Sequence, residues 1–136
     1  MEIQLNKVGD HSEFRSVPLR NRASVSSKSN ITRHYVAVSD GQDIAFVALD
    51  IPEHRDYFCV YELFVDPQHR SCGFGAAIIR KCQLLAAQGG FKKICLIPRP
   101  IEAGWSEEEL RAWYGKLGFT QCPNQSDLVE IVFRDQ

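Results

Sequence analysis

Residues Val65 to Ala76 read Val-Asp-Pro-Gln-His-Arg-Ser-Cys-Gly-Phe-Gly-Ala, the most informative stretch of this chain. An apolar, strand-like run from Phe58 to Val65 leads into it, and a helix-like run from Gly75 to Gln88 follows it. A glycine-bearing turn that opens a helix presents several backbone N–H groups at the positive end of the helix dipole, and this arrangement binds phosphate. Gly73 carries no side chain to block the approach of a phosphate to the backbone.

Two motifs in this half of the chain resemble those of the GNAT N-acetyltransferase superfamily. The first is Arg70-x-x-Gly73-x-Gly75 after a strand that ends in Val-x-Pro, where the family has Arg/Gln-x-x-Gly-x-Gly/Ala. The second is Ala-Trp-Tyr-Gly-Lys-Leu-Gly-Phe at residues 112–119, which is similar to the family's Tyr-x-x-x-Gly-Phe segment. The motifs stand in the family's order and together cover residues 58–119.

Other glycine-rich loops fit this stretch less well. A dinucleotide-binding loop needs Gly-x-Gly-x-x-Gly, and Ile78 stands at the position of the third glycine. A Walker-type loop needs Gly-Lys-Ser/Thr, which the sequence lacks. An unrelated phosphate-binding module stays open as an alternative, and it would show no preference for CoA over other nucleotides.

The resemblance implies an α+β fold, in which a mixed, mostly antiparallel sheet of about six to seven strands is flanked by helices. It also implies an acetyl-CoA cleft between the two central strands, and one acetyltransferase domain over residues 1–136. The expected activity is direct transfer of an acetyl group from acetyl-CoA, the cosubstrate, to a primary amine in a ternary complex. The acceptor would be a small-molecule or peptide amine, which the sequence does not identify. The alternative is a catalytically silent acyl-CoA-binding or interaction domain with the same fold.

The resemblance further implies which residues bind acetyl-CoA. Backbone groups of Phe64 and Val65 would pair with the pantetheine arm, as an added strand would. The pyrophosphate would lie on the backbone N–H groups of the turn, contributed by Arg70, Cys72, Gly73, Phe74, Gly75 and Ala76. The side chain of Arg70 can add charge-assisted contacts.

Tyr114 is the candidate general acid. A phenol with a pKa near ~10 is protonated at neutral pH and can donate a proton to a departing thiolate. Tyr114 matches the tyrosine that the family places beside the cofactor sulfur, although Glu107 stands where the family often has an asparagine. The competing interpretation is a half-buried aromatic side chain on an amphipathic helix.

Glu62 is the candidate general base, as the one carboxylate within the apolar strand before the turn. Burial would raise its pKa toward neutrality, which suits that role. The family's glutamate often lies an odd number of residues earlier, where Tyr61 or Cys59 stands, and a shift of one residue turns a side chain to the other face unless a bulge re-aims it. A structural carboxylate paired with Arg or Lys, and a base that acts through water, stay open as alternatives.

Composition limits the classes of partner. The chain has 136 residues and a net charge of −1, so we expect one domain and no global field that attracts nucleic acid. No apolar run approaches the roughly twenty residues that span a bilayer, and the first residues lack the pattern of a signal peptide, which predicts a cytoplasmic protein without a membrane partner. The short acceptor-side segment predicts a shallow groove, which a second subunit in a homodimer could complete.

The cysteines and histidines predict no metal site. The cysteines are odd in number and irregularly spaced, which argues against a disulfide framework or a zinc site; they are Cys59, Cys72, Cys82, Cys95 and Cys122. Cys72 lies in the proposed phosphate turn, where a helix N-terminus can lower a thiol pKa. We expect it to be either a reactive thiol or a small residue tolerated where the backbone matters more.

Periodicity and turn signals predict the remaining elements. Strands are expected at residues 2–8, 33–39, 43–49, 57–65, 93–97, 120–122 and 128–133, and helices at residues 75–88 and 107–117. Residues 10–30 are polar, so at most a short helix near residues 12–17 is expected, with a loop at residues 24–30. In the first long helix, four apolar residues are expected to share the buried face, namely Ala76, Ile79, Leu84 and Ala87.

Overall fold

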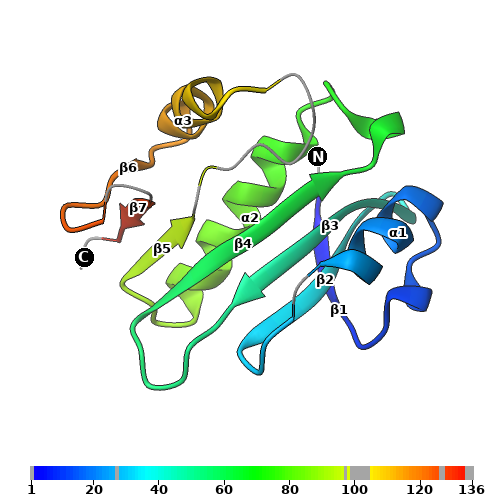
Figure 1. The fold of residues 1–136 in the computed structure, drawn as a ribbon, viewed down its shortest axis with the longest axis horizontal. Helices are drawn as coiled ribbons and strands as arrows, with labels where there is room; N and C mark the ends of the chain where they lie inside the picture. Colours follow the sequence, from blue (N-terminus) through cyan, green and yellow to red (C-terminus); the bar gives the residue numbers. More distant parts are fainter. Residues whose placement is uncertain (1, 27, 97, 99–104, 126–127, 134–136) are drawn as a thin grey trace.

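A computed structural model describes residues 2–26, 28–96, 98, 105–125 and 128–133. These residues form one seven-stranded sheet in the order β1-β2-β3-β4-β5-β7-β6 (Figure 1). Its strands are β1 (Gln4–Val8), β2 (Thr32–Ser39), β3 (Gln42–Asp50), β4 (Tyr57–Val65), β5 (Lys93–Leu96), β6 (Thr120–Gln121) and β7 (Val129–Val132). All neighbouring strands are antiparallel except β4 and β5, which run parallel. The predicted mixed, mostly antiparallel sheet is confirmed.

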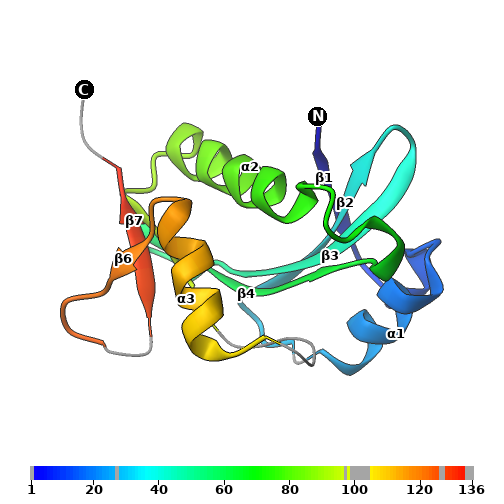
Figure 2. The same ribbon diagram turned by 90° about the horizontal axis from the view of Figure 1, so that it is seen from above.

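The helices lie on both faces of this sheet. They are α1 (Val17–Val25), α2 (Phe74–Gln88) and α3 (Glu107–Lys116), with 3₁₀ turns at His11–Glu13 and Pro67–His69. Figure 2 shows α1 and α2 on opposite faces of the sheet. Helix α2 connects the parallel strands β4 and β5, because a parallel pair needs a long crossover rather than a tight turn.

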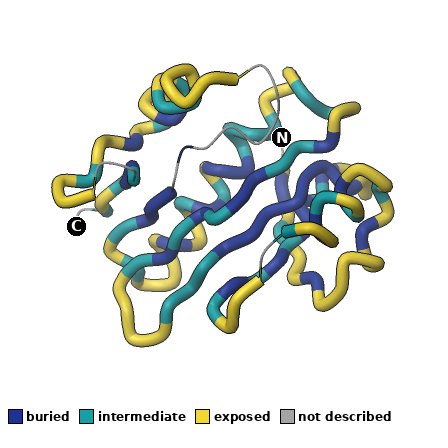
Figure 3. The backbone as a smooth tube through the Cα atoms, viewed as in Figure 1, coloured by how far each residue is buried: buried dark blue, intermediate teal, exposed yellow. Residues whose placement is uncertain are grey.

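The hairpin between β2 and β3 forms where the sequence predicts it. Asp40 and Gly41 make the two-residue turn, and both have positive φ, at 50° and 75°. Asp-Gly suits such a turn, because glycine and aspartate tolerate the left-handed backbone that matches the strand twist. Strand β3 is buried along most of its length, as Figure 3 shows, so the hairpin forms part of the core of the sheet.

The prediction for the segment before β2 was wrong. Instead of a short helix near residues 12–17, the chain forms a 3₁₀ turn and then the nine-residue helix α1. Pro18 lies in the first turn of α1, where proline costs no hydrogen bond, and Ser16 caps the helix by accepting from the Leu19 N–H. The helix has no clear apolar stripe in its sequence, so it is held by the sheet below it rather than by its own periodicity.

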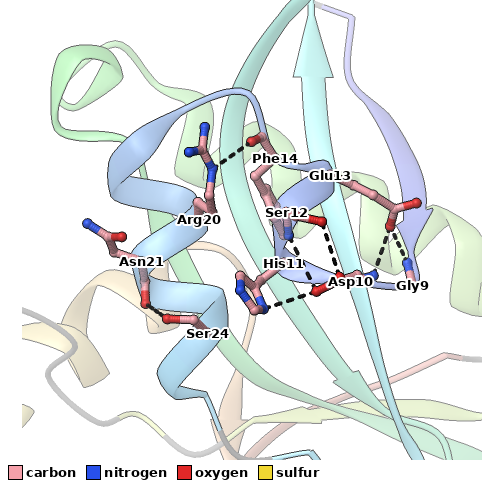
Figure 4. Close-up of polar contacts among 9 residues, drawn as sticks. All are labelled: Gly9, Asp10, His11, Ser12, Glu13, Phe14, Arg20, Asn21 and Ser24. Carbon is pink, nitrogen blue, oxygen red and sulfur yellow. Dashed lines mark hydrogen bonds and ion pairs between the residues drawn. The ribbon is translucent and has the colours of Figure 1, made fainter.

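Local polar contacts order the chain before and within α1, as Figure 4 shows. Asp10 and Glu13 form a capping box, in which Glu13 Oε2 accepts from the Asp10 N–H at 2.9 Å. Arg20 Nε donates to the Phe14 carbonyl at 3.2 Å, which ties the helix to the preceding turn. Phe14 is itself buried against Phe46 of β3, with ring centroids 5.8 Å apart. These contacts fix α1 on its face of the sheet.

The buried face of α2 differs in part from the prediction. Ile79 is buried as expected, but Leu84 and Ala87 are exposed. The inward residues are Ile78, Ile79, Cys82 and Ala86, which follow the spacing of one helical face. The predicted set combined Ile79 with Leu84, and a separation of five residues turns a side chain away from that face.

Helix α3 begins and ends as the sequence indicates. Ser106 and Glu109 form the predicted capping box, with Ser106 Oγ accepting from the Glu109 N–H at 3.0 Å. Gly118, with φ of 102°, follows the helix and lets the chain turn toward β6. Tyr114 and Phe119 enter the same core as α2, with ring centroids 5.7 Å apart.

Within the described ranges, no helix is both long and apolar enough to cross a bilayer.

Candidate functional site

A cavity of about 390 Å³ lies between the end of β4, the start of α2 and the inner face of α3. Its lining residues come from these three elements, from the turn between β4 and α2, and from the segment just before α3: Leu63, Val65, His69, Arg70, Ser71, Gly73, Phe74, Gly75, Ala76, Trp105, Leu110, Trp113 and Tyr114. The volume falls within the roughly 300–1,000 Å³ of small-molecule sites. The cavity is therefore lined by residues of both sequence motifs, the glycine turn at residues 70–75 and the segment at residues 112–119.

The turn between β4 and α2 presents the start of a helix to this cavity. Gly73 is the N-cap residue of α2, has φ of 83°, and places no side-chain hydrogen bond on the helix N-terminus. The first-turn N–H groups of a helix have no partner within the helix, so here they are available to an anion. Ser71 also has positive φ, at 63°, which tightens the turn. The geometry fits the predicted phosphate site.

Two anchors hold this turn in place. Asp66 is buried, and its carboxylate accepts from the Gln68 N–H at 3.0 Å and from the Ser16 hydroxyl. The turn is thereby joined to the N-terminus of α1 as well as to β4. Arg70 Nε donates to the Val65 carbonyl at 3.0 Å, and its guanidinium lies 5.0 Å from the centre of the Phe64 ring. The charge of Arg70 is therefore held at the edge of the cavity.

The two edges of β4 beside the cavity differ in their described strand partners. Strand β4 pairs with β5 through Val60 and Leu96, where the described part of β5 ends, and then runs on to Val65. On its other edge, Leu63, Phe64 and Val65 pair with β3. No described strand pairs with the cavity edge of β4 beyond Val60, as the predicted pantetheine site requires.

Tyr114 reaches the cavity from the last turns of α3. Its side chain is buried, and this burial raises the pKa of the phenol to about 12. The ring packs edge-on against Trp113 at 4.9 Å and against Phe119 at 5.7 Å, which fixes its direction. The phenol is therefore a fully protonated donor at neutral pH, as the role of general acid requires.

The predicted cofactor residues do not all line the cavity with their side chains. Val65, Arg70, Gly73, Phe74, Gly75 and Ala76 do. Phe64 packs against the second core cluster under α1, on the other face of β4. Cys72 is exposed, and its thiol donates to the Arg70 carbonyl at 3.4 Å. Any contribution of Phe64 or Cys72 to the site would therefore come from the backbone.

Glu62 lies on the α1 face of the sheet and is not part of the cavity. Its carboxylate accepts from Arg22 Nε and, at 2.9 Å, from the Ser26 hydroxyl. The register between β3 and β4 shifts by one residue here, because Ala48 pairs with Glu62 whereas Leu49 pairs with Val60. This is the bulge that can re-aim a side chain, and it leaves Tyr61 as the extra residue. Tyr61 packs on the α1 face as well.

His34 of β2 is a second buried polar group on that face. Its ring lies edge-on to Phe46 at 4.9 Å, and within the described residues its Nε2 atom has no hydrogen-bond partner. Burial lowers the pKa of His34 and the nearby charge of Lys28 lowers it further, whereas the Glu62 carboxylate acts in the opposite direction. His34 is therefore a neutral side chain at physiological pH.

Sequence reasoning missed Trp113 and Leu110 as parts of the cavity wall. Trp113 contacts the start of α2 and lines the cavity together with Leu110 and Trp105. The signal was present in the spacing of Leu110, Trp113, Tyr114 and Leu117, which form one apolar stripe on α3. This stripe predicts a buried face, but it does not show that part of the face borders a cavity.

Metal ligands are not gathered in the described part of the chain, where no three histidine, cysteine, aspartate or glutamate side chains form a set that could hold an ion.

Comparisons with known proteins agree with this geometry. A sequence profile described as "Acetyltransferase (GNAT) domain" matches residues 30–121. No curated protein sequence matches the chain. Among solved structures, the dodecameric spermidine N-acetyltransferase from Vibrio cholerae is similar with a TM-score of 0.69 and 15% identity, over 96% of this chain and 93% of that chain.

Two further similar structures contain a cofactor. AtaTR bound with acetyl-CoA has a TM-score of 0.67 and 12% identity, over 96% of this chain and 93% of that chain. The PaiA N-acetyltransferase from Thermoplasma acidophilum in complex with coenzyme A has a TM-score of 0.62 and 14% identity, over 98% of this chain and 100% of that chain. At such low identity these likenesses show the fold alone.

Proposed function

The chain belongs to the GNAT acetyltransferase family, and from this premise we propose that it transfers an acetyl group from acetyl-CoA to a primary amine by direct transfer in a ternary complex. The observation that carries the proposal is the cavity that joins an uncapped helix N-terminus to a buried phenol. Similar structures with bound acetyl-CoA or coenzyme A support the choice of cosubstrate.

The residues of the cavity fit the parts of acetyl-CoA. The first-turn N–H groups of α2 would hold the pyrophosphate, with the guanidinium of Arg70 at the edge. The cavity edge of β4 up to Val65 would pair with the amides of the pantetheine arm. The apolar wall of Trp113 and Leu110 would cover the thioester end and exclude water.

Acetyl-CoA supplies a thioester whose carbonyl carbon accepts the amine, so that a C–N bond forms and the C–S bond breaks. Tyr114 donates its phenolic proton to the departing thiolate, and its raised pKa keeps that proton in place until then. The proton that the nitrogen loses passes to solvent, from which the phenolate is protonated again. The rigid packing of its ring between Trp113 and Phe119 fixes where the proton is delivered.

The general-base role of Glu62 stays a prediction. The contacts with Arg22 and Ser26 favour the structural alternative, in which the carboxylate holds α1 against β4 on the acceptor side. A base role would require the amine, or a water beside it, to reach a carboxylate that already accepts two hydrogen bonds. The same contacts give weight to the second candidate function, an acyl-CoA-binding domain without turnover.

The acceptor side is formed by α1 and by the loop toward β2, which is a short segment. We propose that a second subunit completes this shallow groove. A solution measurement of mass on the active species tests this point. An enzyme that turns over as a strict monomer would contradict it.

The first experiment is a thermal-shift measurement with acetyl-CoA, with ATP and NAD as controls. A ligand at a hundred times its dissociation constant stabilises a protein by about 2.7 kcal/mol, which is a shift of several degrees. We expect this shift for acetyl-CoA and not for the control nucleotides. Release of free CoA in a panel of amines then separates the enzyme from the silent binding domain, because both bind but only the enzyme turns over.

A further inference from the structure

Cys59 of β4 and Cys95 of β5 are direct neighbours on the central parallel strands. The register pairs Cys59 with Cys95, between the pairs Phe58–Ile94 and Val60–Leu96. Those flanking residues all enter the core under α2. Because side chains alternate along a strand, the two cysteines project together from the opposite face of the sheet.

The two thiols are close neighbours across the strand pair. Each thiol shifts the pKa of the other, so that the pKa of Cys59 is raised and the pKa of Cys95 is lowered. Neighbouring strands lie about 4.8 Å apart, which is within the Cα separation that a disulfide accepts. Both cysteines are free, Cys95 being buried and Cys59 partly exposed. A small oxidant can thus approach the pair from the side of Cys59, and the strand spacing already suits a disulfide.

Charges around the pair make one sulfur the better nucleophile. The neighbouring Cys59 thiol and the ammonium of Lys93 lower the pKa of the Cys95 thiol, against the effects of burial and of Glu130. On the other side, Asp50 faces Cys59, whose pKa is raised. Lys93 also contacts Glu130 at 3.4 Å, so part of its charge is shared. Cys95 is therefore the attacking thiolate and Cys59 the resolving thiol.

We propose that Cys59 and Cys95 form a redox site, which a small peroxide converts reversibly into a disulfide. The Cys95 thiolate attacks one oxygen of hydrogen peroxide, so that an S–O bond forms, the O–O bond breaks, and the leaving hydroxide takes a proton to become water. The Cys59 sulfur then displaces the hydroxyl group of the Cys95 sulfenic acid and releases a second water. In sum, two thiols and one peroxide give one disulfide and two waters.

The crosslink would join β4 and β5 near the end of their described pairing, close to the cavity. The pair Cys59–Cys95 comes one residue before Val60–Leu96, beyond which no described strand pairs with the cavity edge of β4. The closed loop from Cys59 to Cys95 contains the glycine turn and all of α2. Because a long loop loses much entropy when it is closed in the unfolded chain, we expect the oxidised protein to melt several degrees higher.

The test is peptide mapping of the folded chain after treatment with hydrogen peroxide. Free thiols are alkylated, the protein is digested without reduction, and crosslinked peptides are identified by mass. We expect a Cys59–Cys95 peptide, a loss of two hydrogens from the intact mass, and reversal by dithiothreitol. Five thiols that stay free, or a crosslink through Cys72 or Cys122, would overturn the proposal, as would an oxidised form that melts no higher than the reduced form.

Matched variants make the test specific. Cys59→Ser should abolish the crosslink, whereas Cys122→Ser should retain it, although Cys122 also lies near Lys93 and Glu130. If Cys59→Ser does not fold, the peptide map of the unsubstituted protein decides alone. None of these measurements involves acetyl-CoA, so the redox site and the proposed enzyme activity can fail independently.

Discussion

The indole of Trp113 lies 3.3 Å from the point at which a Cβ atom on Gly75 would stand. This contact joins α3 to the first turn of α2, at the place where the cavity meets the helix N-terminus. A side chain at position 75 would therefore meet the indole. The backbone conformation does not itself require a glycine there, because φ of Gly75 is not in the left-handed region. The two motifs that the sequence presents separately meet at this contact.

Replacement of Gly75 by alanine should weaken acetyl-CoA binding. The new methyl group would push the Trp113 indole, which forms part of the cavity wall, by a few tenths of an ångström. We expect the dissociation constant to rise by roughly threefold to tenfold, or about 1 kcal/mol. Titration followed by Trp fluorescence measures this. The control is Gly115→Ala, which has nothing within 4 Å of its new Cβ and should leave the affinity unchanged.

Gly73→Ala tests the turn through its backbone. A residue with a side chain in the left-handed conformation of Gly73 loses about 1–2 kcal/mol of folding free energy, so the variant should be less stable. Relief of this strain should also move the N–H groups of the first turn of α2. Gly41→Ala is the matched control, since it has similar φ (75°) in a hairpin turn whose residues do not line the cavity. We expect both variants to melt lower, and only Gly73→Ala to bind acetyl-CoA less tightly. Equal affinities of the two variants for acetyl-CoA would show that the turn is not part of the binding site.

Tyr114→Phe should lower turnover and leave cofactor affinity almost unchanged. The ring keeps its packing against Trp113 and Phe119, and only the proton donor is lost. General acids contribute roughly 10²–10⁴-fold to rate, so a fall of about 100-fold in kcat is expected. Tyr57→Phe, at the start of β4 beside Lys93, serves as the control. Full turnover in Tyr114→Phe would exclude the phenol from the mechanism.

Tyr114 should also make stability depend on alkaline pH. Its pKa is about 12 in the folded chain and near 10 when unfolded, so the unfolded state loses the proton first. The stabilisation is complete below pH 10 and is lost as the pH rises from 10 to 12. The unsubstituted protein should therefore lose stability more steeply than Tyr114→Phe in this range, in denaturant titrations at several pH values. Parallel pH curves for the two proteins would show that the phenol is not buried.

Glu62→Gln should act on stability more than on chemistry. The carboxylate holds Arg22 and Ser26 of the acceptor side, and loss of its charge should cost about 1–2 kcal/mol. Arg22→Met should cost a similar amount, and the double variant should cost less than the sum because the residues interact. We expect kcat to change by less than tenfold, as measured by CoA release. A loss of 100-fold or more in Glu62→Gln, with an unchanged melting temperature, would instead establish Glu62 as the base.

The sequence predicted the elements whose signals are local. Asp40-Gly41 specified a tight turn, the Ser106–Glu109 box specified where α3 begins, and the glycine turn placed the start of α2 at residue 75, one residue after its observed start at Phe74. In each case the backbone conformation depends on the residues themselves, because side-chain caps and left-handed glycines act within a few positions. The same locality explains why α1 was missed, since its stability comes from the sheet rather than from its own residues.

Tertiary structure alone decided which of these residues meet. The bulge at Tyr61 sets the face of Glu62, and it arises from the register between β3 and β4. The contact of Trp113 with Gly75 and the pairing of Cys59 with Cys95 join residues far apart in the chain. Such relations depend on how strands align and helices pack across long separations. Local propensity carries no information about them, because each is the outcome of burying all the apolar faces at once.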